Sequence, residues 1–374
     1  MDSNTTLYKI ALSMVAGMGP VTAGRLIGAF GTPKAVFDAG KKELASVAGV
    51  HPAVASQIVQ KQVLSEAEKE LLFVEENQIK VLLIGDDNYP HRLRQCADAP
   101  AILYVKGEFN PDQHKVLSIV GTRNATSHGK AICKDFIHAL AEQNILIVSG
   151  MAYGIDYCAH REAISAGLPT AAVFAHGLDI IYPSVHRKTA EEMLGNGGWI
   201  SEFRSGTPMD KNYFPRRNRI VAGLCDGVLV VESDRKGGSL ITADIANSYS
   251  REVMAVPGKP TDPRSSGCNW LIKTNRGALV ESANDVLKQM NWETGNKKPA
   301  TMQLTAFPTL NDDELNLARC LQESGPVSID SLADIAGKPV RQISHLLLNL
   351  ELEGVVKAMP GKRYRLSKPL ASYA

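Results

Sequence analysis

The feature that most constrains the fold of this chain is the alternation of short apolar runs with helix-like segments over residues 80–290. The runs are β-branched and apolar at consecutive positions, which is typical of strands buried on both faces. Helical patterns separate them, for example over 129–142, 155–166 and 241–250, and the stretch 82–114 carries turn signals and can extend the sheet. This alternation predicts a doubly wound parallel sheet. The expected strands are 81–84, 116–120, 145–148, 170–174, 227–231 and 253–256.

Residues 5–70 consist of short helical segments around turns that contain glycine. Gly17 and Gly49 each stand between two apolar segments, and Pro20 and Pro52 follow them. Glycine suits a left-handed turn and proline suits the first turn of the next helix, so the pattern predicts a tandem helix-hairpin-helix (SAM-like) unit. Such hairpins can offer backbone N–H groups to phosphate. A module that only docks to protein is an equally good interpretation, because the first turn has few basic residues near it.

The C-terminal part of the chain follows a polar stretch, 293–311, that contains glycine and proline and is expected to be a linker. Helical patterns come next, near 313–323, 329–336 and 340–353. A basic hairpin over 355–366, with a Pro-Gly tip, closes the pattern. Three helices and a basic hairpin predict a winged-helix-like domain.

The winged helix has two open roles, because such domains bind either DNA or protein. Ser328 is placed to cap the second helix, and the third carries Arg341 and His345 as its polar candidates beside a leucine-rich side. These residues favour a DNA role only slightly. The expected domains are a helical module over 1–75, an extended Rossmann-like domain over 76–292, a linker over 293–311 and a winged-helix-like domain over 312–374.

Composition limits the compartments in which the protein can work and the kinds of binding site that it can carry. The formal net charge is only +2 over 374 residues, so any polyanion site must be a local patch. The six cysteines are scattered without a CxxC pair, which argues against a zinc ribbon or a disulfide framework. The N-terminus lacks the basic region of a signal peptide, and no apolar run reaches membrane-spanning length. We expect a soluble, cytoplasmic protein without a membrane span.

The most basic segment runs from Lys211 to Arg219, where nine residues hold four positive charges and two aromatic rings without an acid. Guanidinium groups pair with phosphate, and rings stack on unpaired bases. A solvated basic turn before a core helix would explain the segment if it stood alone. Phe214 is the candidate stacking ring, and it could equally anchor the segment in the core. The candidate phosphate-binding residues here are Arg216, Arg217, Asn218 and Arg219.

Two glycine-containing loops follow expected strands in the first half of the sheet. Gly121, Thr122 and Arg123 end one strand, and Thr126 or Ser127 can cap the helix that follows. In an open α/β sheet ligands collect at the carboxyl ends of strands, where glycine lets amides approach a phosphate and arginine adds a clamp. A tight turn with a solvated arginine is the alternative.

The second loop repeats this arrangement after the next strand. Ser149 offers a hydroxyl, and Gly150 and Gly154 frame a tight turn. Asp156 is interpreted as an acid in the first turn of a helix, and His160 on the same helix as a structural histidine.

A third loop follows the strand at 227–231, where Gly237 and Gly238 permit close approach, Ser239 can donate a hydrogen bond and Lys236 supplies charge. Neither the GxGxxG nor the GxxxxGK[ST] pattern occurs, which disfavours a dinucleotide-binding enzyme and a P-loop ATPase. Paired carboxylates, a Ser-His-Asp arrangement and a metal-ligand cluster are also missing from the sequence pattern. We therefore expect no catalytic residue, cofactor or metal, and a site that holds phosphates.

Several motifs in a fixed order connect these loops to a known family. They are SIVGTRNAT (118–126), SGMAYGID (149–156), GLDIIYP (177–183), SEF (201–203), FPRRNRIVAGL (214–224), VVES…GGSLITA (230–243), AVPG (255–258) and GCNWLI (267–272). In this order they closely resemble the bacterial DNA-processing protein DprA family, also called Smf. The resemblance is strong over residues 80–290, and the two terminal segments fit the layout of that family more loosely.

The resemblance implies an extended Rossmann-like domain that binds single-stranded DNA. Members of the family act as homodimers, protect incoming strands during natural transformation and help to load the recombinase RecA; they are not known as enzymes. By motif position, the resemblance assigns to the phosphate-binding pocket Gly121, Arg123, Ser149, Gly150, Gly154, Arg216, Arg217, Asn218, Arg219, Lys236, Gly238 and Ser239.

We expect Arg123 and the Arg216–Arg219 cluster to form one cationic groove over the strand ends. Alanine at Arg123 or Arg217 should then weaken DNA binding without unfolding the protein.

An enzyme of the Lonely Guy type, a nucleotide phosphoribohydrolase, is the competing interpretation, together with a small-nucleotide-binding protein. The Gly237-Gly238 loop is similar to the PGGxGTxxE motif of those hydrolases. Lys236, however, stands in place of the proline, and Asp244 in place of the glutamate. An adaptor whose terminal modules recruit proteins is a third possibility.

Overall fold

The structure is a computed structural model that describes residues 3–292, 311–352, 355–359 and 363–366. The chain divides into two compact units, residues 1–293 and 294–374, and each is described by itself. The linker expected over 293–311 lies almost entirely outside the described residues, as does the tip of the C-terminal hairpin. Among the described residues, no helix has the length and apolar content needed to cross a membrane.

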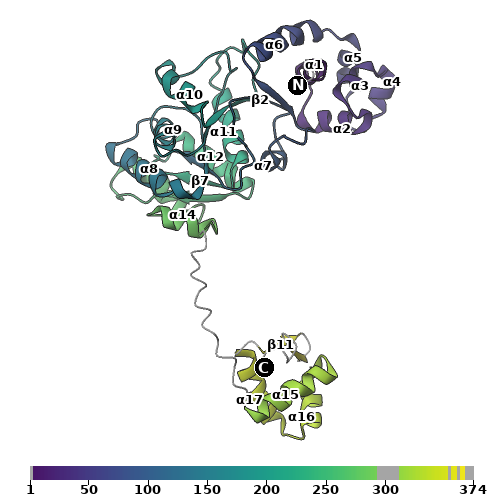
Figure 1. Ribbon diagram of the computed structural model, residues 1–374, viewed down its shortest axis with the longest axis vertical. Coiled ribbons are helices and arrows are strands. Elements are labelled where there is room, and N and C mark those ends of the chain that lie inside the picture. The colour runs from purple at the N-terminus through teal and green to yellow at the C-terminus, as the bar shows by residue number, and fades with distance from the viewer. Residues whose placement is uncertain (1–2, 293–310, 353–354, 360–362, 367–374) are drawn as a thin grey trace. The chain divides into compact units, whose positions relative to one another are not determined.

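A sheet of nine strands forms the centre of the first unit (Figure 1). Its spatial order is β1-β2-β6-β5-β4-β3-β7-β8-β9. The strands from β6 to β9 pair in parallel, whereas β2 pairs antiparallel with both β1 and β6. The strands are β1 (Lys80–Leu83), β2 (Ile102–Lys106), β3 (Val116–Val120), β4 (Leu146–Ser149), β5 (Thr170–Val173), β6 (Gly197–Ser201), β7 (Gly227–Val230), β8 (Glu252–Ala255) and β9 (Ala278–Leu279).

Helices cover both faces of the parallel part, as the alternating pattern predicts. On one face α8 (Ser127–Ala139) and α9 (Ile155–Ser165) pack over β3 and β4 in one apolar cluster with α14 (Ala283–Gln289). On the other face α11 (Tyr213–Leu224) and α12 (Gly238–Ser248) pack over the same strands. Strands buried on both faces bring side chains of both orientations into the core, which explains their continuous apolar sequence. The remaining helices of this region are α7 (His91–Arg94), α10 (Arg187–Met193) and α13 (Ser266–Lys273).

The sequence pattern gave six strands at nearly their observed positions and missed three. It expected the stretch 82–114, which contains β2, to extend the sheet but placed no strand at β2, and it left out β6 and β9. Strand β6 begins with Gly197 and Gly198, which lack the apolar side chains that a strand pattern needs. A Cβ atom at Gly197 would lie 2.0 Å from the carbonyl oxygen of Thr170 on the neighbouring strand, so the missing side chains permit this close pairing.

The N-terminal helices form the expected pair of hairpins. Gly17 and Gly49 adopt positive φ angles of 81° and 79°, and Pro20 and Pro52 are the first residues of the helices that follow. This is the glycine and proline chemistry that the sequence predicted. The helices are α1 (Ser3–Met14), α2 (Pro20–Phe30), α3 (Pro33–Asp38), α4 (Lys41–Ser46), α5 (Pro52–Gln60) and α6 (Leu64–Glu76).

These helices share a hydrophobic core with the β1 and β2 end of the sheet, beside which Figure 1 shows them. The cluster joins Ile10 and Leu26 of the helices to Val81 of β1 and to Trp199 of β6. The apolar core therefore continues across the position, between residues 75 and 76, at which the sequence pattern separates two domains. That boundary remains a prediction.

The second unit contains the expected three helices and a hairpin. Strand β12 (Arg363–Leu366) lies between β10 (Val327–Ser328) and β11 (Val356–Met359). The Ser328 hydroxyl accepts a hydrogen bond from the Ser331 N–H at 3.2 Å, which confirms the predicted cap. The helices are α15 (Asp312–Ser324), α16 (Ile329–Ala336) and α17 (Val340–Leu352), and they enclose one apolar cluster.

Candidate functional site

The carboxyl ends of β3, β4 and β7 surround a pocket of 640 Å³, which we call the strand-end pocket. Strand β4 lies on one side of β3 and β7 lies on the other. Successive strands are therefore added to the sheet in opposite directions from this point, although all of them stay parallel. Ligands of open α/β sheets bind at such switch points. The lining residues are Val120–Asn124, Gly150, Ala152, Asp156, Tyr182, Lys211, Phe214, Pro215, Arg217, Asn218, Val221, Asp234, Gly237–Ser239, Ile241 and Thr242.

Arg217 is the buried cation of this pocket, with an exposed fraction of 4%. Its Nη1 donates to the carbonyl oxygens of Gly150, after β4, and Val173, at the end of β5. Its Nε donates to the Asn218 side chain at 3.2 Å. Burial lowers the pKa of Arg217 to about 10, so the group stays charged at neutral pH. A guanidinium that uses carbonyls as partners fixes the loop after β4 without losing its charge.

The loop after β4 accommodates this arginine because of its glycines. A Cβ atom at Gly150 would lie 2.3 Å from the Arg217 guanidinium. Gly154 has a φ angle of 80°, and a Cβ there would lie 2.1 Å from the carbonyl oxygen of Thr122 in the neighbouring loop. Glycine is therefore required at both positions by close approach, and at Gly154 also by backbone conformation.

Behind Arg217 lies a layer of buried titratable groups. Burial raises the pKa of Asp156, while the charge of Arg217 acts in the opposite direction. His160 is fully buried, its Nδ1 lies 2.7 Å from the Thr170 hydroxyl, and burial lowers its pKa to about 3. His186 also has a pKa lowered by burial. These groups support the pocket floor, as expected for a structural His160.

The outer wall of the pocket combines rings and exposed cations. The Arg123 guanidinium lies 5.3 Å from the centre of the Phe214 ring, and the Tyr182 ring is 6.3 Å from Phe214. Phe214 is half-buried, Tyr182 is 47% exposed, and Arg123 and Lys211 are exposed. Because Phe214 faces the pocket and Arg123, it is available to a ligand instead of being enclosed in the core. Such a wall can bind a phosphate and stack on a base.

The loops on either side of the pocket are tied together by Glu232, two residues after the end of β7. Its carboxylate accepts hydrogen bonds from the Thr126 N–H and hydroxyl, both at 2.8 Å. The Thr126 hydroxyl also accepts from the Gly129 N–H and so caps α8. Of the two caps that the sequence allowed, the structure selects Thr126. The loop that carries Arg123 is therefore held rigidly against the end of β7.

Gly237, Gly238 and Ser239 line the pocket at the start of α12. The Ser239 hydroxyl donates to the Ser233 hydroxyl at 2.8 Å, which fixes the turn. A Cβ atom at Gly238 would meet no heavy atom within 4 Å, so this side of the loop is open. Lys236 is exposed and is not among the residues that line the pocket.

The expected single groove from Arg216 to Arg219 is wrong, because α11 turns these side chains to different sides. Phe214, Arg217 and Asn218 face the strand-end pocket. Arg216 and Arg219 face a second pocket and both bond Glu202, at 2.7 and 2.5 Å. A helix advances about 100° per residue, so neighbouring arginines cannot share one face. The DNA-binding role of Arg216 and Arg219 remains a prediction.

The structure thus collects most, but not all, of the predicted site. Ser149 lies beneath the pocket and donates to the Ile119 carbonyl at 2.6 Å, and Gly154 supports the neighbouring loop. The lining residues that the sequence reasoning did not assign to the site include Asn124, Tyr182 and Lys211, although Asn124 and Tyr182 lie within quoted motifs and Lys211 begins the basic segment. The predicted residues that line the strand-end pocket are Gly121, Thr122, Arg123, Gly150, Phe214, Arg217, Asn218, Gly237, Gly238 and Ser239.

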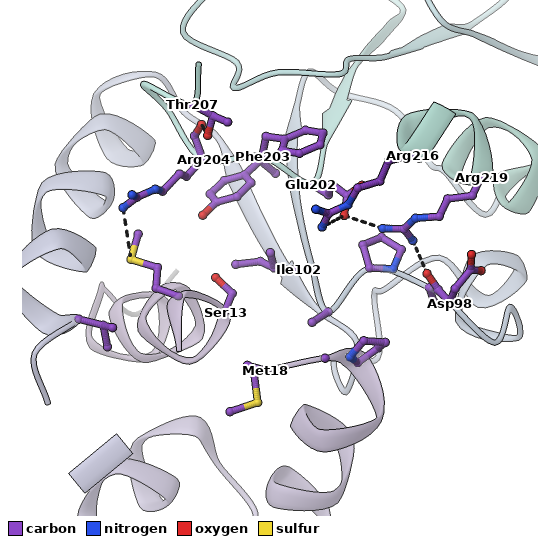
Figure 2. A pocket seen from close by; sticks show the side chains of 18 of the residues that line it. Ser13, Met18, Asp98, Ile102, Glu202, Phe203, Arg204, Thr207, Arg216 and Arg219 are labelled. Atoms are coloured by element: carbon purple, nitrogen blue, oxygen red, sulfur yellow. Dashed lines mark hydrogen bonds and ion pairs between the residues drawn. The ribbon is translucent and has the colours of Figure 1, made fainter. Parts of the chain in front are cut away.

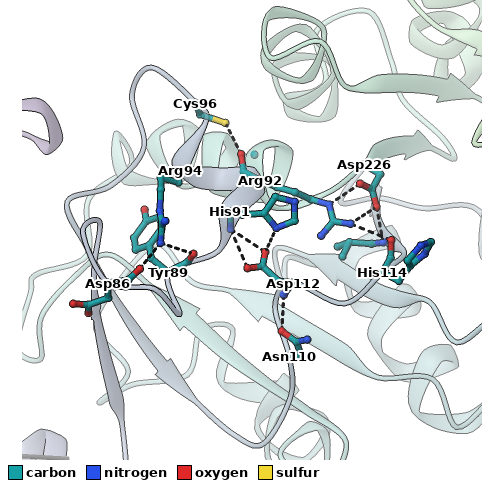
Figure 3. A network of polar contacts seen from close by, with 12 residues as sticks. Asp86, Tyr89, His91, Arg92, Arg94, Cys96, Asn110, Asp112, His114 and Asp226 are labelled. Atoms are coloured by element: carbon teal, nitrogen blue, oxygen red, sulfur yellow. Dashed lines mark hydrogen bonds and ion pairs between the residues drawn. The ribbon is translucent and has the colours of Figure 1, made fainter. Parts of the chain in front are cut away.

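A second polar cluster, shown in Figure 3, lies at the opposite ends of the strands. Arg92 is buried and donates to both carboxylate oxygens of Asp226, which precedes β7, at 2.6 and 3.0 Å. Asp226 also accepts from the Val116 N–H at the start of β3. His91 binds Asp112 nearby at 2.8 Å. This network joins α7 to the amino ends of the strands, so it stabilises the sheet away from the pocket.

Comparison with known families gives three matches along the chain. A family model described as DNA recombination-mediator protein A matches residues 80–291. A SAM-like helix-hairpin-helix tandem matches residues 9–61, and a DprA winged helix domain matches residues 300–362. All three parts of the predicted layout are therefore found.

Individual relatives agree with these matches. Protein Smf of Escherichia coli is 35% identical over 80% of this chain and 81% of its own length. DNA processing protein DprA of Streptococcus pneumoniae is 39% identical over 56% of this chain and 73% of its own length.

Two solved structures are also similar. That of DprA from Streptococcus pneumoniae has a TM-score of 0.62 and 31% identity, covering 76% of this chain and 97% of that one. That of DNA processing protein A from Helicobacter pylori, reported with a single-stranded DNA binding mode, has a TM-score of 0.52 and 28% identity, covering 57% and 96%.

Proposed function

The chain belongs to the DNA recombination-mediator protein A family, and from this membership we propose that it binds single-stranded DNA in the strand-end pocket. The observation that carries the proposal is the composition of this pocket. It joins the exposed cations Arg123 and Lys211, the buried cation Arg217 and the accessible ring of Phe214 around three glycine-containing loops. Phosphate pairs with guanidinium forks and backbone amides, and an unpaired base stacks on a ring.

The shape of this site favours single strands over duplex DNA. In a duplex the bases are stacked and paired, so a ring at the wall of a pocket cannot reach their faces. A single strand can turn a base toward Phe214 and Tyr182 while its phosphates meet Arg123 and Lys211. The expected preference therefore arises from stacking, and the affinity from phosphate contacts that depend on salt.

The wider role that we propose is that of a recombination mediator in natural transformation or general recombination. The protein would protect incoming single strands and help to load the recombinase RecA onto them. A homodimer would allow two strand-end pockets to hold one strand and would raise avidity without new contacts. The resemblance to the family supports these partners.

A nucleotide phosphoribohydrolase is not favoured. The residue in the position of the glutamate of those enzymes, Asp244, is not among the residues that line the strand-end pocket, and it pairs with Arg276 at 3.3 Å. The hydrolase interpretation would require the acidic side chain of this motif position to lie in the strand-end pocket, within reach of a bound nucleotide.

The proposal is tested by fluorescence anisotropy of a labelled oligo-dT and of the matching duplex across a salt series. We expect tight, salt-dependent binding that favours the single strand. Arg123→Ala should weaken binding by about tenfold and reduce the log–log salt slope by about 0.7, because one phosphate contact is lost. Arg187→Ala, an exposed arginine on α10 outside the pocket, is the matched control.

Two results would contradict the proposal. Absence of binding to either form of DNA at low salt would remove the function itself. Unchanged affinity and salt slope in Arg123→Ala, with normal binding by the parent protein, would remove the strand-end pocket as the site.

A further inference from the structure

The second pocket, which we call the helical-side pocket, has a volume of 790 Å³ and lies between the N-terminal helices and the sheet. Figure 2 shows Arg204 on one side of it, Arg216 and Arg219 on the other, and Met18 on the N-terminal segment below. The strand-end pocket and the helical-side pocket share α11, whose opposite sides they use.

The position of the helices on the sheet is fixed by polar contacts at the edge of the helical-side pocket. Glu70 of α6 accepts hydrogen bonds from the Ser205 N–H at 3.0 Å and from the Ser205 hydroxyl at 2.5 Å. Glu66, one turn earlier, bonds Arg204 at 2.6 Å. Glu70 is 4% exposed, so this junction is part of the folded core. The pocket is therefore a built feature of the first unit.

The arginines of the helical-side pocket are of two kinds, one largely buried and two exposed. Arg219 is largely buried and is held by Glu202, whose side chain is only 3% exposed. The side chains of Arg204 and Arg216 are 48% and 53% exposed. A guanidinium has five N–H donors, and the only hydrogen bond that Arg216 makes with the described residues is through Nη2 to Glu202. Both exposed arginines thus have donors available for an incoming anion.

Glu202 is the buried centre of the arginine cluster. Its Oε2 accepts from Arg216 and Arg219, whereas its Oε1 is buried without a hydrogen-bond partner among the described residues. Leaving an acceptor unpaired at a buried site is costly, which suggests that the carboxylate is retained for what it positions. It holds two guanidiniums at the wall of the helical-side pocket.

The wall between the two groups of cations is apolar. Met14 and Met18 contribute flexible thioether side chains from α1 and the turn after it. Phe203 lies under Arg216, whose guanidinium is 5.2 Å from the ring centre. Methionine adapts to flat ring systems through favourable sulfur contacts. Exposed arginines beside an adaptable apolar wall suit a phosphate linked to a base.

We propose that the helical-side pocket is a second contact site for the same single strand of DNA, reached by crossing the first turn of α11. This inference rests on the proposed function, because it extends the strand beyond the strand-end pocket. Phe214 and Arg216 lie on different sides of a helix that is about 10 Å across, so a strand that leaves one pocket meets the other. The N-terminal helical module would then take part in binding.

The charge balance of the helical-side pocket indicates how a phosphate would enter. The three arginines are offset by Glu66, Asp98 and Glu202. Arg204 and Glu66 are both about half exposed, and ion pairs of this kind are weak. A phosphate can therefore replace Glu66 as the partner of Arg204, while the buried Glu202 keeps its arginines. Glu66 acts as a competitor of the strand.

Two substitutions with opposite expected effects test this. Arg204→Ala should weaken binding of an oligo-dT of about 16 nucleotides by about fivefold, because a phosphate contact is lost. Glu66→Gln should strengthen binding of the same oligonucleotide by about threefold, since the competing carboxylate is removed. An oligo-dT of about 5 nucleotides, which occupies only the strand-end pocket, should bind both variants like the parent protein.

Arg187→Ala is the matched control for loss of an exposed arginine, and thermal melts of each variant show whether the fold is kept. If the parent protein binds neither oligonucleotide, the proposed function itself fails. If the parent protein binds both, and both variants bind the longer one unchanged, only the second site is overturned. Equal changes for the short and the long oligonucleotide would also overturn it, because the helical-side pocket would then not be a separate contact.

Discussion

The strand-end pocket and the helical-side pocket share helix α11, yet its arginines have different partners in the two. In the strand-end pocket Arg217 donates its Nη1 hydrogen bonds to main-chain carbonyls, which carry no charge, and the Asp156 carboxyl group acts on its pKa without a direct ion pair among the described residues. In the helical-side pocket Arg216 and Arg219 both meet the carboxylate of Glu202. A run of arginines in a sequence therefore does not by itself specify a cationic surface, because the partner of each guanidinium decides what charge a ligand meets.

The same contrast holds for two phenylalanines. Arg123 lies 5.3 Å from the centre of Phe214, and Arg216 lies 5.2 Å from the centre of Phe203, so the two pairs have similar geometry. Phe203, however, is only 7% exposed, and its ring centre is 4.5 Å from that of Tyr213. Phe214 is half-buried at a pocket wall. The Phe203 ring therefore supports the fold, whereas the Phe214 ring is open to a ligand.

The largest expected effect separates these two pairs. Phe203→Ala should lower the free energy of unfolding by about 3 kcal/mol or more, because a buried ring leaves a cavity. Phe214→Ala should leave stability nearly unchanged and weaken single-strand binding by about 1–3 kcal/mol through lost stacking. Urea denaturation and anisotropy on both variants would measure the contrast. Equal loss of stability in the two would show that Phe214 belongs to the core.

A somewhat smaller effect is expected for Arg217, and it revises the expectation from sequence that alanine here would leave the fold intact. Arg217→Ala removes the donors of the Gly150 and Val173 carbonyls, so the unfolding free energy should fall by about 2–3 kcal/mol. Arg217→Lys keeps the charge without the fork and should recover only part of this loss. Urea denaturation of the two variants measures the loss of unfolding free energy. An alanine variant as stable as the parent protein would contradict the role of Arg217 as a structural cation.

The smallest expected effect concerns how the unfolding free energy depends on pH through His160, which lies behind the strand-end pocket. His160 has a pKa of about 3 in the folded protein against 6.5 when unperturbed, so the unfolded state binds more protons between these values. Its contribution to stability is complete above pH 6.5 and is lost as the pH falls, by about 2 kcal/mol at pH 5. Asp156 acts in the opposite direction, because burial raises its pKa.

The test compares the parent protein with His160→Gln at pH 7 and pH 5 by urea denaturation. The drop in unfolding free energy between the two pH values should be smaller in the variant. An equal drop in both proteins would mean that other groups, such as His176 and His186, whose pKa values are also lowered by burial, account for the acid sensitivity.

The sequence alone determined the layer architecture, because continuous apolar runs and helical periodicity report which faces are buried. It also located the three loops of the strand-end pocket, since glycines at the ends of parallel strands mark the edge where ligands collect. The turns at Gly17 and Gly49 followed from local chemistry, which needs only neighbouring residues. Strand β6 was not predicted, because its first two residues are glycines and add no apolar side chains to a strand pattern. Only its pairing with β5 in the structure identifies it.

Only the tertiary structure decided how the arginines divide. Arg216, Arg217 and Arg219 stand within four consecutive positions, and all three carry the same guanidinium group with the same charge. Their roles differ because Glu202 and the carbonyl of Gly150 approach α11 from different sides, brought there by β6 and β4. The pairing of a side chain is set by long-range contacts that no local window of sequence contains. For that reason the sequence identified the edge of the sheet that forms the site, and the fold selected which cations face it.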